Sequence, residues 1–172
     1  TGKPADVAAL LVLRGDAHAA LKQLDDAKNA YEEARRLAPD LPEASQGLAV
    51  LALVQQRTDE AERLADEAVQ KSGQRADPWM LKAGLLRAQG KHPQAIDAYQ
   101  QALKREPNHI GARLSLAALY MQDRKFEAAQ QEIEAARKAE PKSLEVRLVQ
   151  AQLDFSQQKY PQARDGLQEV LK

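Results

Sequence analysis

The chain has 172 residues, and its 25 lysines and arginines equal its 25 aspartates and glutamates in number, so the formal net charge is zero. Both signs alternate along the chain, and we therefore expect no nucleic-acid partner and no anionic membrane surface as a partner. Cysteine is absent, which excludes disulfides, thiolate metal ligands and cysteine nucleophiles, and no apolar run approaches the roughly 20 residues of a transmembrane helix.

Helix-forming residues dominate the composition and predict an all-α chain. Alanine occurs 32 times, against three isoleucines and two threonines. Pro93 and Pro161 suit the first turn of a helix, where the missing N–H group has no intrahelical partner to lose. In chain order, the pattern predicts helices at 5–20, 25–37, 42–55, 59–71, 77–89, 93–105, 110–122, 127–139, 144–157 and 161–171.

A period of 34 residues joins these helices into pairs. Alanine recurs at this spacing without a gap, at Ala27, Ala61, Ala95, Ala129 and Ala163. The eighth position of each repeat is also small: Gly15, Ala49, Ala83, Ala117 and Ala151. Small side chains let helices approach closely, while large ones such as Tyr31, Phe126 and Tyr160 are predicted to fill the space between pairs. The sequence predicts one array over 1–172, with repeats 8–41, 42–75, 76–109, 110–143 and 144–172.

The third repeat carries the most specific pattern. Its residues resemble the tetratricopeptide repeat at Trp79, Ala83, Leu86, Gly90, Ala95, Tyr99, Ala102 and Pro107. The resemblance implies an all-α fold, an α-solenoid with a right-handed superhelix of about five helix-turn-helix repeats. Because Thr1 is not a methionine and Lys172 soon follows a helical pattern, we expect a fragment of a longer array.

The same resemblance implies a partner-binding groove along the first helix of each repeat, at repeat positions two, five, nine and twelve. These positions are mostly apolar or small, which suits an apolar strip on a protein or peptide partner. Apolar residues at helical spacing are also typical of a core, so packing against the adjacent helix is the alternative for Met80, Leu114, Met121 and Phe155. The candidate groove residues are Val12, Asp16, Gln46, Val50, Leu53, Met80, Gly84, Arg87, Leu114, Ala118, Met121, Leu148, Gln152 and Phe155.

One well-known ligand of this family is disfavoured by the sequence. Members that grip a C-terminal carboxylate use Lys at position five and Asn at position nine, and no repeat here has either residue there. Position two is instead acidic in three repeats, at Glu43, Asp77 and Glu145. We therefore expect no carboxylate clamp.

Catalytic and metal sites are not predicted. His18, His92 and His109 have no His or Cys partner at helical spacing and are interpreted as surface histidines. Asp25 and Asp26 are interpreted as charge at a helix N-terminus rather than as paired catalytic carboxylates. We expect no enzymatic activity, no metal and no cofactor.

The pattern therefore predicts a protein-interaction scaffold. Its repeats resemble tetratricopeptide lipoproteins associated with PEP-CTERM sorting and exopolysaccharide export, which implies a bacterial protein in the periplasm or anchored to the outer membrane. Two alternatives are a soluble, cytoplasmic peptide-binding adaptor or co-chaperone and the non-catalytic repeat region of a larger enzyme. Uncovered apolar residues such as Leu167 and Leu171 also predict end-to-end self-association.

Overall fold

The computed structural model describes residues 3–171, where every regular element is a helix. Every helix boundary lies within one residue of its predicted position, and the ends of the predicted array at Thr1 and Lys172 lie outside the described residues. The helices are α1 (Pro4–Ala20), α2 (Leu24–Leu37), α3 (Pro42–Val54), α4 (Thr58–Gln70), α5 (Asp77–Ala88), α6 (His92–Arg105), α7 (Ile110–Gln122), α8 (Phe126–Ala139), α9 (Leu144–Ser156) and α10 (Tyr160–Val170).

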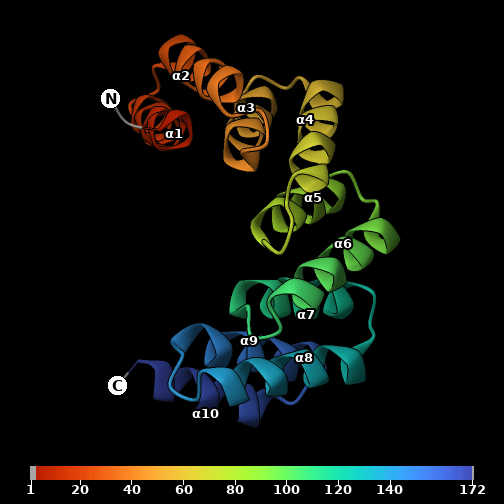
Figure 1. Ribbon diagram of the computed structural model, residues 1–172. Helices are drawn as coiled ribbons and strands as arrows, with labels where there is room; N and C mark the ends of the chain where they lie inside the picture. The colour runs from red at the N-terminus through yellow and green to blue at the C-terminus, as the bar shows by residue number, and fades with distance from the viewer. Residues whose placement is uncertain (1–2, 172) are drawn as a thin grey trace. The chain divides into compact units, whose positions relative to one another are not determined.

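The helix contacts divide the chain into two compact units, residues 1–85 and 86–172. In the first unit α1 packs against α2 and α3 against α4, and α3 also contacts α1 and α2 (Figure 1). In the second unit α7 packs against α8 and α9 against α10, while α9 also contacts α7 and α8 (Figure 1). Within each unit, the first helix of a repeat therefore joins its own pair to the preceding one. The single array over 1–172 stays a prediction.

Alanine forms most of the closest helix contacts, as the period predicts. All five alanines of the 34-residue series are buried, and so are the five small residues at position eight. A methyl group or a hydrogen at these points lets two helix backbones approach closely. The recurring small residues are thus the residues on which the pairs pack.

Tyr31 lies between two glycines of different helices. A Cβ atom added at Gly15 on α1 or at Gly47 on α3 would come within 2.5 Å of a carbon of the Tyr31 ring. The ring is buried, and no side chain larger than hydrogen fits at either glycine without moving it. Sequence analysis singled out Gly15 but not Gly47, because position six is not small in every repeat.

The turn between the two helices of each repeat has one conformation throughout. Its central residue has a positive φ in all five repeats, at Lys22, Gln56, Gly90, Arg124 and Gln158. After each first helix, two N–H groups donate back to its last turn: for example, Lys22 N–H donates to the Ala19 carbonyl and Gln23 N–H to the His18 carbonyl, both at 2.9 Å. All five residues therefore adopt a left-handed conformation that favours glycine, although only one of them, Gly90, is a glycine.

Replacing Arg124 with Gly is expected to raise the free energy of unfolding by about 0.5–1 kcal/mol, because the left-handed penalty outweighs the extra unfolded-state entropy of glycine. Gly90→Ala is expected to lower it by a similar amount, since Gly90 has a φ of 72°. Urea denaturation followed by circular dichroism measures both. Gln100→Gly inside α6 is the control and is expected to destabilise; a destabilising Arg124→Gly would contradict the prediction.

Candidate partner-binding surface

Two of the predicted groove residues belong to the core instead. Val12 on α1 is buried among the apolar side chains of the first unit, and Leu114 on α7 is buried in the core of the second. A partner cannot contact either side chain while its unit is folded. For Leu114 the alternative interpretation, packing between helices, is therefore the correct one, and Val12 and Leu114 leave the candidate groove.

The first unit retains an exposed apolar pair on α3. Val50 is 46% exposed, and Val54, one turn further on, is 62% exposed. Leu53 is partly buried and packs against the core, whereas Asp16 on the neighbouring α1 is exposed. Sequence analysis missed Val54, because the family pattern places the groove at position twelve rather than thirteen. The remaining candidates in this unit, all partly buried, are Gln46, Met80 and Gly84.

The second unit places its candidates on two helices in contact, α7 and α9, except for Arg87, which lies near the end of α5. Met121 on α7 is partly buried and packs against the core, as its alternative interpretation predicts, and Ala118 is also partly buried. Phe155 on α9 is exposed, and its ring meets the Tyr160 ring edge-on at 5.5 Å between centroids. The other candidates here, all exposed, are Arg87, Leu148 and Gln152.

A shallow pocket of about 440 Å³ adjoins Met121 at the turns that follow α7 and α9. Most of its lining residues are polar, and Met121 and Phe126 are the two apolar ones. Sequence analysis missed it, since turn positions lie outside the groove pattern. The lining residues are Met121, Gln122, Arg124, Phe126, Ser156, Gln157 and Gln158.

Asp16 is held in place by the buried tyrosine of its own repeat. The Tyr31 hydroxyl donates to Asp16 Oδ1 at 2.7 Å. Burial of Tyr31, together with its hydrogen bond to this carboxylate, raises the pKa of the phenol well above its usual range. The hydroxyl therefore stays protonated, and Asp16 presents a fixed carboxylate on α1, a helix that contacts α3.

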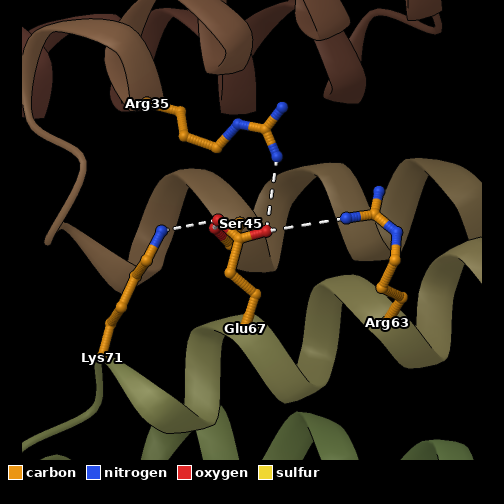
Figure 2. Close-up of polar contacts among 5 residues, drawn as sticks. All are labelled: Arg35, Ser45, Arg63, Glu67 and Lys71. Atoms are coloured by element: carbon orange, nitrogen blue, oxygen red, sulfur yellow. Dashed lines mark hydrogen bonds and ion pairs between the residues drawn. The ribbon is translucent and has the colours of Figure 1, made fainter.

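A second polar cluster centres on Glu67 of α4, outside the predicted groove (Figure 2). Glu67 Oε1 accepts hydrogen bonds from the buried Ser45 hydroxyl at 3.0 Å and from Lys71 Nζ at 2.5 Å. Glu67 Oε2 lies 3.4 Å from an Arg35 guanidinium nitrogen and 3.9 Å from that of Arg63. One carboxylate thus ties together α2, α3 and α4.

The charge of Glu67 follows from these contacts. Burial alone would raise its pKa, but the hydrogen bonds from Lys71 and Ser45 and the positive charges of Lys71 and Arg35 outweigh burial. The pKa of Glu67 is consequently below its usual value. The carboxylate is ionised at neutral pH, and the cluster is a stabilising feature of the first unit.

Each histidine has a local structural contact. His18 Nδ1 lies 2.7 Å from Gln23 Oε1, and His109 Nδ1 accepts from the Ala112 N–H group as the N-cap of α7. His92 lies 2.9 Å from Asp123 Oδ1, and this hydrogen bond lowers the pKa of Asp123. Over residues 3–171, no group of three metal-ligating side chains comes together, and no helix is long and apolar enough to cross a membrane.

A family model of the tetratricopeptide repeat matches residues 3–85 and 86–153. The chain belongs to the tetratricopeptide-repeat family. The boundary between the two matches coincides with the boundary between the two compact units. Because tetratricopeptide repeats are in general interaction modules, this member is a protein-interaction scaffold in that general sense.

Solved structures of tetratricopeptide-repeat proteins share the fold. A tetratricopeptide repeat protein from Parabacteroides merdae is 19% identical, with a TM-score of 0.79 over 96% of this chain and 66% of that one. Pseudomonas aeruginosa pilF is 18% identical, with a TM-score of 0.83 over 96% of this chain and 75% of that one. YrrB, described as having an unusual peptide-binding site, is 15% identical, with a TM-score of 0.68 over 94% and 83%.

Identities this low establish the fold alone. They confirm the prediction of an all-α helical-repeat solenoid. The chain spans slightly less than two thirds of the Parabacteroides merdae protein. No curated protein sequence matches this tetratricopeptide-repeat chain.

Proposed function

We propose that the first helices of the repeats bind an apolar, positively charged segment of a partner protein, and that Val50 and Val54 are the centre of the groove. The exposure of these two valines on α3 is the observation that carries the proposal. The preceding repeat packs against α3 within the same unit. The two valines are exposed although this repeat is packed on α3. Their exposure is therefore not caused by a missing preceding repeat.

Charge indicates the kind of segment. Asp16 presents its carboxylate on α1, the neighbour of α3, and Glu43 lies at position two of α3 itself, paired with Arg75. An acidic border favours lysine or arginine beside the apolar side chains of a ligand and disfavours a C-terminal carboxylate. The proposed ligand is therefore an amphipathic cationic segment.

A fluorescent peptide of leucine and lysine with blocked ends tests this proposal. The wild-type chain is expected to bind it. Val50→Ser combined with Val54→Ser is expected to weaken binding at least tenfold, because it removes the apolar contacts without changing the charge, and helicity is expected to stay unchanged. The matched peptide with glutamate in place of lysine is expected to bind weakly. Unchanged affinity in the double variant would overturn the proposal.

Asp16→Asn separates the contribution of charge from that of shape. This substitution is expected to lower the affinity for the lysine peptide. The affinity for an uncharged peptide of leucine and serine is expected to stay the same. Leu10→Glu, on an exposed face of α1 outside the groove, is the control and is expected to bind like wild type. Loss of binding in this control would assign the peptide to another surface.

The cellular setting stays a proposal as well. The resemblance of the repeats supports exopolysaccharide export or protein sorting at the periplasmic side, with the soluble adaptor and the non-catalytic region of a larger enzyme as alternatives. The gene regions that flank residues 1–172 test the choice: a lipid-attachment cysteine supports export, and a catalytic domain supports the enzyme. End-to-end self-association, predicted from Leu167 and Leu171, is likewise a proposal, supported by the exposure of both residues.

A further inference from the structure

A pocket of about 340 Å³ is lined by α8, α9 and α10, entirely within the second unit. Its polar groups come from Arg137 on α8 and from Arg147, Gln150 and Asp154 on α9, and Gly166 on α10 adds an apolar side. The walls belong to two consecutive repeats, since α9 contacts both α8 and α10. The volume is at the lower end of the range for ligand sites, so the pocket suits a single side chain or a small molecule.

Gly166 is the residue that makes room for this pocket. A Cβ atom at this position would lie 3.6 Å from Ala151 Cβ, an ordinary contact, and the φ of Gly166 is not positive, so packing and backbone conformation do not require glycine here. Glycine inside a helix lowers stability relative to alanine. Leu64, at the same repeat position, is fully buried in the core of the first unit. Position twenty-three holds Ala30, Leu64, Ala98, Glu132 and Gly166 in the five repeats.

Arg147 lacks the partner that its counterpart in the preceding repeat has. Arg113 is also at repeat position four, and its guanidinium nitrogen lies 2.7 Å from a carboxylate oxygen of Glu132, at position twenty-three. The last repeat keeps the arginine, but Gly166 stands in place of the glutamate. Among the side chains that the structure describes, none forms a hydrogen bond or an ion pair with Arg147. The pocket thus contains a guanidinium without a carboxylate.

A second guanidinium is held at the same pocket by hydrogen bonds. Arg137 donates to Gln150 Oε1 at 2.7 Å, and Gln150 Nε2 donates to Asp154 Oδ1 at 3.3 Å. The lining carries two positive charges, on Arg137 and Arg147, and one negative charge, on Asp154. Guanidinium groups bind carboxylates with charge-assisted hydrogen bonds, often two at once. The pocket therefore favours a carboxylate ligand.

We propose that this pocket binds the carboxylate of a glutamate side chain on a partner protein, with Arg147 as its main ligand and Arg137 beside it. The bound carboxylate takes the place that Glu132 has beside Arg113 in the preceding repeat. The pocket lies outside the groove, because its polar residues have repeat positions four, seven, eleven and twenty-eight. It is also distinct from the carboxylate clamp of the family, which uses positions five and nine. The proposal is independent of the cationic segment proposed for the first unit.

NMR titration of the isotopically labelled chain with a blocked peptide of alternating glutamate and serine tests the proposal. The amide signals of Ala151 and Gly166 are expected to shift, with low affinity because a single side chain enters the pocket. The same peptide with glutamine in place of glutamate is expected to cause no shift. Arg147→Gln is expected to abolish the shifts. Arg164→Gln, which removes an exposed arginine of α10 outside the pocket, is the matched control and is expected to bind like wild type.

Gly166→Glu supplies the carboxylate from within the chain, as Glu132 does in the preceding repeat. This variant is expected to abolish peptide binding and to have a higher Tm than Gly166→Gln, because its new carboxylate pairs with Arg147. The difference in Tm is expected to disappear when both variants also carry Arg147→Gln. Equal Tm values for Gly166→Glu and Gly166→Gln would contradict the proposal, and so would peptide shifts that persist in Arg147→Gln.

Three further measurements identify the source of the carboxylate. Free glutarate is expected to compete poorly, because it lacks the other contacts of a peptide; competition at micromolar concentration would assign the pocket to a small dicarboxylate and overturn the partner-protein proposal. Glu169 has the repeat position of Glu67, and Glu169→Gln is expected to bind the peptide at least as tightly as wild type, so a loss of binding would count against the pocket. Val50→Ser with Val54→Ser is expected to bind the glutamate peptide normally, so the pocket and the groove can fail separately.

Discussion

Tyr31→Ala is expected to lower the free energy of unfolding by about 3–5 kcal/mol, the range for large aromatic residues removed from a core. The ring is buried between Gly15 on α1 and Gly47 on α3, and its hydroxyl holds Asp16. Its removal leaves a cavity at the contact between two repeats and an unpaired carboxylate oxygen. Urea denaturation, followed by circular dichroism at neutral pH, measures the loss.

Substitutions of Gly15 and Gly47, the two glycines in contact with the Tyr31 ring, test the same packing. Gly15→Ala and Gly47→Ala are each expected to cost about 1–3 kcal/mol, because the new methyl group would overlap the ring. Gly166→Ala on α10 is the matched control: its Cβ would lie 3.6 Å from Ala151 Cβ, an ordinary contact, so it is expected to stabilise the helix by about 0.5–1 kcal/mol. Equal tolerance of Gly47→Ala and Gly166→Ala would contradict this description of the interface.

Removal of Glu67 is expected to have the second-largest effect. Glu67→Ala should cost about 1–3 kcal/mol at neutral pH, because the fully buried Ser45 hydroxyl loses its acceptor and Lys71 and Arg35 lose their counter-ion. Glu67→Gln keeps an acceptor oxygen and should cost less. Thermal unfolding measures both, and Glu33→Gln at an exposed position of α2 is the control, with a change within about 0.5 kcal/mol.

The contribution of Glu67 to the free energy of unfolding should decrease as the pH falls. Because folding lowers the pKa of this carboxyl, its stabilisation is present above the ordinary glutamate pKa of 4.5 and is lost as the pH falls through the lowered folded value. The stability difference between wild type and Glu67→Gln should therefore shrink from pH 7 to pH 2.5. A difference that persists at pH 2.5 would show that shape, rather than charge, makes Glu67 stabilising.

The sequence predicted the helices and their pairing well, for a local reason. The helix ends carry their own signals, such as Pro93 and Pro161 in first turns, and these signals do not depend on distant contacts. The 34-residue alanine series predicted the buried face of each helix, because small residues recur where backbones approach. Both signals can be read within one repeat.

Exposure at single positions was predicted less well, because it depends on which neighbour is present. Phe126 and Tyr160 occupy the same repeat position, yet Phe126 is partly buried against its core while Tyr160 is exposed. Val12 and Val50 were assigned to the same groove, but only Val50 is accessible. The Glu67 cluster was missed because its partners Arg35 and Ser45 are far away in sequence. The only signal within reach was the charge spacing of Arg63 and Lys71, four residues on either side of Glu67.

The fit between the Tyr31 ring and Gly47, at position six of the next repeat, restricts how such a chain can be rearranged. If residues 42–75 were excised, Leu81 would take the place of Gly47 opposite Tyr31, and two bulky side chains would compete for room that holds one. Duplication or loss of a repeat therefore demands compensating changes at the new junction. The repeats share one fold, but the side chains at their contacts differ from one junction to the next. Versions of this chain with the repeats in another order should therefore fold poorly unless the contact residues are changed as well.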